Sequence, residues 1–334
     1  MDQKRVLFIR NPFIRAYQDY AFPMSTMEND ISANAWIFSN VIQLYYSLEQ
    51  KVPLTYFYEG ITSNPSKYIP IFDKQSFNIK TISNNTIDII DLIMYCLNDG
   101  YYFTTTVDEF YIPNRVVYNK THFSHGIMVY GYDPKAQVLY TAGYDVTNHY
   151  KFPNEVSFEA FKKAFKNNGR PEENIFIFKR NNKTYEFDCL QVRELLSDYL
   201  HSKNTSTRLS ILQNPLEGYK FGISVYTYLK ELIYNHKAGY KRVDWRPFYV
   251  IWEHKKCMIE RIKYMYNTKH LLHADTLYQQ FINIEKCARI ILDLYIKYSI
   301  TLNIEILDRV NSHIDNLIIS EKKALELFIS LIVE

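Results

Sequence analysis

The segment from Tyr101 to Asp145 constrains the fold of this chain more than any other. It contains three runs of β-branched and aromatic residues separated by turn signals, which predict three strands, the third returning beside the second. The predicted strands are Tyr101–Val107, Ser124–Tyr132 and Val138–Ala142. Two acids and two histidines accompany them, namely Asp108, Asp145, His122 and His125. Because these residues sit on strands and their connections, we look for chemistry here.

The rest of the chain divides into a mixed part and a helical part. Up to about residue 183, predicted strands alternate with helices; beyond it, helical periodicity dominates. The clearest helix, at 275–299, repeats its apolar residues every three or four positions, as in a helix packed against other helices. We therefore predict an α+β domain over 1–183 and an all-helical bundle over 184–334.

A helix is predicted close to the start of the chain. Asp30 is placed to accept backbone N–H groups as its N-cap. Apolar residues follow at helical spacing from Ile31 to Tyr45. We expect this helix to be the first organised element of the fold.

Composition excludes several classes of protein. The 334 residues carry a net charge of only +3, with no basic run, so a nucleic-acid partner is not expected. No stretch approaches 18 uncharged apolar residues, so no membrane span is expected. The four cysteines are far apart and lack metal-ligand spacing, which favours a reduced, cytoplasmic protein. No phosphate-binding glycine loop occurs, and no cofactor is indicated.

His125 is the main candidate for chemistry. It begins the strand HGIMVYGYD, and a histidine there can act as a general base if an acid holds its other ring nitrogen. Asp145, on or just past the returning strand, is the natural candidate for that acid. The alternative is a strand-end histidine with an ordinary backbone hydrogen bond.

Residues 100–180 resemble the N-terminal domain of the butirosin biosynthesis protein H family. The pattern VDEFYIP, then HFSHGIMVYGYD, then PKAQVLYTA carries the resemblance. Farther along, FGISVYTYLKELI and RPFYVIWEHKKCMIERIKYM resemble segments that follow this domain in proteins encoded with peptide-assembly enzymes. That family is related to cysteine peptidases that process bacteriocin leaders and, more distantly, to papain.

The resemblance implies a papain-like fold and transfer of an acyl group from a carrier thioester to an amine. It implies that His125 is the catalytic histidine and Asp145 its partner. The family's cysteine nucleophile is expected near Asp30–Ala35, where this chain has no cysteine. Ser32 is the best-placed substitute, at the first turn of the helix. An ordinary helix-start serine is the simpler interpretation of it. Cys96 is interpreted as a buried core residue.

Three further residues complete the predicted site. Asp108, Tyr111 and Tyr132 are assigned to substrate binding, although Asp108 also suits a structural cap before Pro113. A metal site built from Asp108, His122, Asp145 and His149 is an alternative, but no compact ligand motif supports it.

Two functions follow as hypotheses. In the first, the chain serves a non-ribosomal peptide or polyketide pathway and acts on a carrier-bound acyl or peptidyl group by transfer or hydrolysis. In the second, it is an inactive pseudoenzyme that binds a carrier protein or small peptide. A homodimer is left open in both.

Overall fold

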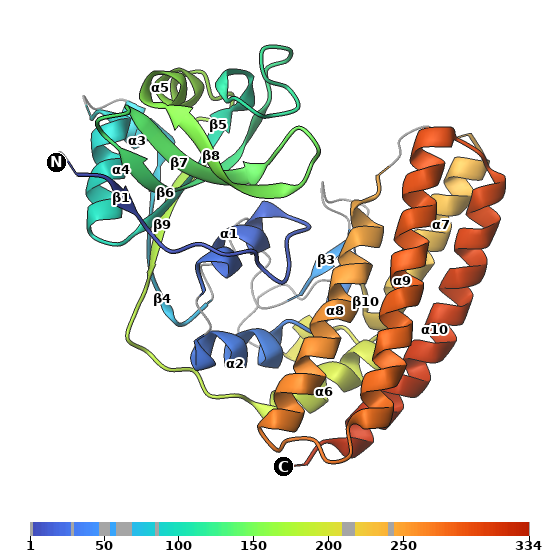
Figure 1. Ribbon diagram of the computed structural model, residues 1–334. Coiled ribbons are helices and arrows are strands. Elements are labelled where there is room, and N and C mark those ends of the chain that lie inside the picture. Colours follow the sequence, from blue (N-terminus) through green and yellow to red (C-terminus); the bar gives the residue numbers. More distant parts are fainter. Residues whose placement is uncertain are drawn as a thin grey trace. The chain divides into compact units, whose positions relative to one another are not determined.

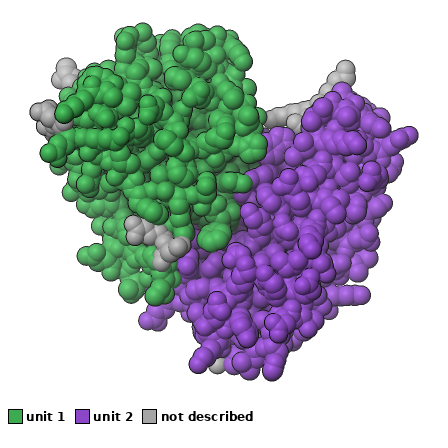
Figure 2. Space-filling model, in the orientation of Figure 1, with its two compact units in different colours: residues 1–33, 62–184 green, residues 34–61, 185–334 purple. Residues whose placement is uncertain are grey.

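The computed structural model describes residues 3–27, 30–46, 54–57, 69–83, 87–208, 218–239 and 244–333. The chain forms two compact units (Figure 2). Unit 1 comprises 1–33 and 62–184, and unit 2 comprises 34–61 and 185–334. The break after residue 184 lies beside the boundary expected at 183, whereas residues 34–61, expected in the first domain, belong to the helical unit. The fold is mixed, with an antiparallel sheet and a helical C-terminal region.

Unit 1 is built on a seven-stranded sheet in which every pairing is antiparallel. Along the sheet the strand order is β4-β9-β5-β6-β7-β8, and β1 pairs with β6 beyond the bulge near Gly131. The strands are β1 (Arg5–Val6), β4 (Phe72–Asn78), β5 (Tyr102–Asp108), β6 (Ser124–Asp133), β7 (Val138–Tyr144), β8 (Tyr150–Ser157) and β9 (Asn174–Arg180).

Helices lie on both sides of this sheet (Figure 1). The helices of unit 1 are α1 (Gln18–Thr26), α3 (Ile79–Ser83), α4 (Ile89–Asn98) and α5 (Phe158–Lys166), with the short 3-10 helix η2 (Glu109–Tyr111) after β5. Apolar faces of α4 and α5 share one hydrophobic core with residues of β5, β6 and β9. Helix α1 lies across the sheet from α5 in Figure 1 and has contacts with β7.

Helix α1 corrects the expected order of elements, because it precedes the helix predicted from Asp30. Its sequence QDYAFPMST contains Pro23 and is buried from Tyr20 to Thr26, so it shows no amphipathic period. The following helix α2 (Ile31–Asn40) is shorter than predicted. The chain then enters strand β2 (Leu44–Tyr46), which pairs with β3 (Leu54–Tyr56).

Unit 2 is mostly helical. Its helices are α6 (Cys189–Leu200), α7 (Val225–Lys237), α8 (Arg246–Asn267), α9 (Asp275–Thr301) and α10 (Glu305–Leu331). The 3-10 helices η3 (Thr205–Arg208) and η4 (Gly222–Ser224) lie between α6 and α7 in the chain. A small antiparallel sheet, in the order β10-β2-β3, adds strand β10 (Lys220–Phe221). No helix in the described ranges has the length and apolar character needed to cross a membrane.

A fully buried polar network lies inside unit 2. The Lys255 ammonium on α8 is paired with the Glu321 carboxylate on α10, and both side chains have no exposed surface. Lys255 also donates to Tyr199 and to His254, at 3.1 and 2.9 Å. Burial lowers the pKa of Lys255, while the Glu321 carboxylate opposes that shift. The network joins helices α6, α8 and α10 through polar groups that water does not reach.

We predict that Lys255→Met destabilises unit 2 by about 3–5 kcal/mol, because it leaves a buried carboxylate without its counter-ion. Lys230→Met, in the exposed pair with Asp315, is the matched control and is expected to cost at most about 1 kcal/mol. All three tryptophans of the chain lie in unit 2. Urea unfolding followed by tryptophan fluorescence therefore reports on this unit. Equal costs for the two variants would contradict the prediction.

Candidate functional site

The site is centred on His125, at the second position of β6. Its ring nitrogen Nδ1 lies 3.1 Å from Oε1 of Glu109, the first residue of η2. The imidazole is 32% exposed and the Glu109 side chain 9% exposed, so one ring nitrogen faces a buried acid. Since an ionised carboxylate can only accept, the neutral ring carries its proton on Nδ1 and leaves Nε2 basic.

Local sequence explains why Glu109 reaches His125. Strand β5 pairs with β6 so that Val107 faces His125 and Asp108 faces Ser124. The chain then turns into η2, and the Glu109 backbone N–H donates to the carbonyl of Phe123. This backbone bond holds the acid beside the start of β6.

Asp108 is the cap that sets this turn. Its Oδ1 accepts the backbone N–H groups of Phe110 and Phe123, at 3.1 and 3.0 Å, and its Oδ2 lies 2.6 Å from Nδ1 of His122. Burial opposes ionisation of Asp108, but the His122 contact and the two backbone bonds outweigh it and lower its pKa. The structural interpretation of Asp108 therefore fits its contacts better than substrate binding does.

The acid beside His125 is Glu109, which corrects the expectation that Asp145 fills that place. Oδ1 of Asp145 accepts the backbone N–H groups of Thr147 and His149, at 2.8 and 3.1 Å, and the Thr147 hydroxyl at 2.6 Å. Its Oδ2 pairs with Lys151 at 2.6 Å. The carboxylate thus closes its own turn between β7 and β8.

The other expected site residues lie in structural positions. Tyr132 is 1% exposed and its hydroxyl donates to Asn98 at 2.8 Å, so burial corrects its assignment to substrate binding. Tyr111 packs against the core of unit 1 and has ring contacts with Phe110 and His122. Ser32 is 6% exposed, and its backbone N–H donates to Asp30. In the described residues, the polar side chain within hydrogen-bond distance of His125 is Glu109 and not Ser32.

No thiol of unit 1 is placed for attack. Cys96 is the one cysteine in the sequence of this unit. It is 3% exposed within the hydrophobic core, and burial raises the pKa of its thiol to about 11. A thiol with this pKa is protonated at neutral pH and is a poor nucleophile.

Sequence reasoning missed two members of the site, Glu109 and Arg115. Arg115 follows η2 in a turn and is 3% exposed. Its Nε lies 3.5 Å from Oε1 of Glu109, and its Nη1 donates to the carbonyl of Tyr144. The sequence feature that could have indicated Glu109 is the pair of acids Asp108-Glu109 directly after a predicted strand. The prediction used Asp108 alone.

Aromatic rings line the other sides of His125. The ring centroids of Phe123 and Tyr144 lie 5.5 and 6.2 Å from that of the imidazole. Phe123 is 46% exposed, so an apolar surface adjoins the imidazole. In the part of the chain that the structure describes, no cluster of three or more ligating side chains fits a metal ion.

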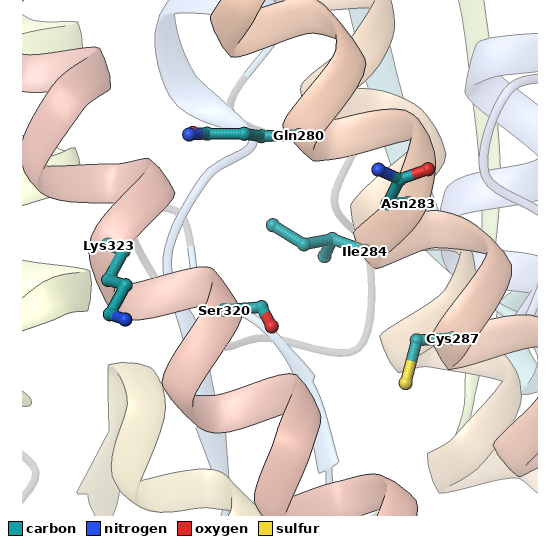
Figure 3. A pocket seen from close by; sticks show the side chains of 6 residues that line it. All are labelled: Gln280, Asn283, Ile284, Cys287, Ser320 and Lys323. Carbon is teal, nitrogen blue, oxygen red and sulfur yellow. The ribbon is translucent and has the colours of Figure 1, made fainter.

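A groove in unit 2 lacks comparable chemistry. It lies between α9 and α10, has a volume of about 260 Å³, and is lined by the residues labelled in Figure 3. Among them, the cation Lys323 has no acid beside it in the lining. Burial raises the pKa of the Cys287 thiol, which disfavours its reactive form. We therefore place the candidate site in unit 1.

We predict that Asp145→Asn weakens the turn at 145–149 without changing His125. Burial opposes ionisation of Asp145, but Lys151 and Thr147 outweigh it, so its pKa is lowered. A carboxyl group whose pKa is lower in the folded state stabilises that state at every pH above its unfolded pKa of about 4. This stabilisation is lost as the pH falls from the unfolded pKa through the folded pKa. The amides of Thr147 and His149 should lose about 1–2 kcal/mol of hydrogen-exchange protection at pH 7. In acid, the protection of these amides in the wild type should fall toward that in the variant. An equal difference in protection between the two proteins at pH 7 and at pH 2 would contradict this prediction.

Comparison with known proteins does not assign the chain to a family. No protein-family model matches it, and no curated protein matches it. The resemblance of residues 100–180 to the butirosin biosynthesis protein H family therefore stays a prediction. What the site can do follows from its own geometry, a half-buried histidine held by a buried acid.

Proposed function

We propose that unit 1 has a papain-like fold and transfers or hydrolyses a carrier-bound acyl or peptidyl group without a covalent enzyme intermediate. The observation that carries this proposal is the 3.1 Å contact between His125 Nδ1 and buried Glu109. It supports a general base whose Nε2 remains available for an incoming nucleophile. The sequence resemblance supports the substrate class and a non-ribosomal peptide or polyketide pathway.

The proposed reaction needs no protein thiol. An acceptor amine or water binds with its proton toward Nε2 of His125 and attacks the thioester carbonyl. Nε2 takes that proton as the new C–N or C–O bond forms and the C–S bond breaks. The imidazolium then returns the proton to the departing thiolate, giving the acyl product and a free thiol. Glu109 keeps the ring oriented and stabilises its positive charge during the step.

Phe123 and Tyr144 support a role in binding the acyl group. They flank the imidazole at 5.5 and 6.2 Å between ring centroids, and Phe123 is exposed. An apolar acyl chain laid on this surface would lose contact with water beside the base. The donor in this proposal is an acyl or peptidyl group on a carrier protein or a short peptide.

Binding without turnover is the second candidate. It is favoured by the core position of Cys96 and by the burial of Ser32, which is 6% exposed, because a buried thiol and a buried hydroxyl are poorly placed to attack a bound acyl group. In that case the surface beside His125 would hold the carrier-bound group and release it unchanged.

Release of thiol from an acyl-loaded carrier protein tests the proposal. We expect His125→Ala to reduce the rate by about 10²–10⁴-fold, because the general base is lost. Glu109→Gln should reduce it by a smaller factor, since the ring remains but is no longer held by a charge. His149→Ala, a histidine in the turn closed by Asp145, is the matched control and should retain the wild-type rate.

The same assay separates the alternatives. A rate that is unchanged in His125→Ala would contradict the general-base mechanism. Carrier binding that depends on His125 and Phe123 without thiol release would favour the binding module. Trapping of an acyl group on Ser32, detected by mass spectrometry, would restore the covalent route.

A further inference from the structure

The guanidinium of Arg115 fills the space that a side chain at position 143 would need. Its guanidinium lies against Gly143 on β7, where a Cβ atom would stand 2.5–2.9 Å from the guanidinium atoms. Its Nη1 donates to the Tyr144 carbonyl. Glycine at position 143 therefore leaves the space that this buried cation fills.

Arg115 and His125 share one acceptor. Oε1 of Glu109 lies 3.1 Å from His125 Nδ1 and 3.5 Å from Arg115 Nε. Glu109 is 7% exposed and Arg115 3% exposed. A carboxylate this deeply buried is costly to ionise without a cation, and a guanidinium stays charged at any ordinary pH. Glu109 is therefore held between a permanent cation and a titratable ring.

We propose that Arg115 is a positioning residue for His125: as the permanent counter-ion of Glu109, it holds that carboxylate against Nδ1 of His125 and so leaves Nε2 as the base. This inference rests on the proposed function, which uses Nε2 of His125 as the general base. The inference gives both Arg115 and Gly143 a role in that function, because glycine at position 143 of β7 leaves room for the guanidinium.

The effect of Arg115 on proton uptake by His125–Glu109 follows from the charges around this pair. Glu109 faces His125 from η2, and Tyr144 faces it from β7. Arg115, in the turn after η2, contacts Glu109. The charge of Asp145 and the hydroxyl of Tyr150 act on Arg115, while the pair of Asp108 and His122 lies one residue away along the chain. Adding a proton to His125–Glu109 places a positive charge near the guanidinium. Loss of Arg115 therefore raises the pH at which the pair takes up that proton.

The pH dependence of thiol release tests this role. In Arg115→Met we expect the acidic limb of the rate profile to move up by about one pH unit, as for a charge removed at a distance of several ångströms. Arg115→Lys keeps the charge, so its limb should stay near the wild-type position even if the rate falls. A purely structural role predicts lower rates with the limb unmoved in both variants, and that result would overturn the proposal.

Titration of His125 by NMR tests the same role independently of turnover. The carbon resonance of ring Cε1 should titrate about one pH unit higher in Arg115→Met than in wild type, and near wild type in Arg115→Lys. If wild type shows no thiol release, the proposed function fails while this titration still decides the role of Arg115. An unchanged titration in Arg115→Met would overturn it.

Gly143→Ala provides a second variant if Arg115→Met does not fold. The added methyl group displaces the guanidinium but keeps every charge of the chain. We expect the His125 titration to move upward, by less than in Arg115→Met. A His125 titration that is unchanged while the guanidinium is displaced would also overturn the proposal.

Discussion

The buried carboxylate of Glu109 is the interaction on which the account of unit 1 depends. It is placed by the first backbone bond after β5 and receives both Arg115 and His125 on one oxygen. An ionised acid at 7% exposure requires such partners, so the turn, the cation and the histidine form one arrangement. The function proposed for the site follows from this electrostatic requirement, because it fixes which nitrogen of His125 is basic.

Unit 2 also contains a buried carboxylate that needs a counter-ion, but there the whole pair is enclosed. Lys255 and Glu321 are also buried together, but they are enclosed by Tyr199, Tyr226 and His254 and have no exposed surface. His125, in contrast, retains about a third of its surface. Both sites pair a buried acid with basic groups, but of these two described sites the one in unit 1 has a titratable side chain that reaches solvent.

Much of the fold was predictable because its elements carry strong local signals. The strands between residues 101 and 144 and the long helix α9 appear close to their predicted positions, since their periodicity reflects one buried face. Helix α1 was not predicted, because it is buried almost throughout and contains Pro23. Strand β8 was also missed, since KFPNEV gives little alternation of apolar residues. Tertiary packing decides both elements.

The site was less predictable than the fold. His125 was identified from its place at the start of β6, and Cys96 lies in the core as expected. Asp145 was predicted to be the orienting acid because of its position after a strand. Its carboxylate instead makes three hydrogen bonds and one ion pair with residues 147–151. Differences of a few ångströms in the path of a turn decide which of several acids contacts a histidine. The spacing of residues along the sequence does not determine that path.

The tautomer of neutral His125 tests the central claim most directly. Long-range nitrogen–proton NMR spectra distinguish a ring protonated on Nδ1 from one protonated on Nε2, above the pH at which the imidazolium is lost. The account predicts the Nδ1–H form in wild type, with the preference reduced in Glu109→Gln. A ring protonated on Nε2 in wild type would contradict it, because Glu109 would then not hold the histidine and Nε2 could not serve as the base.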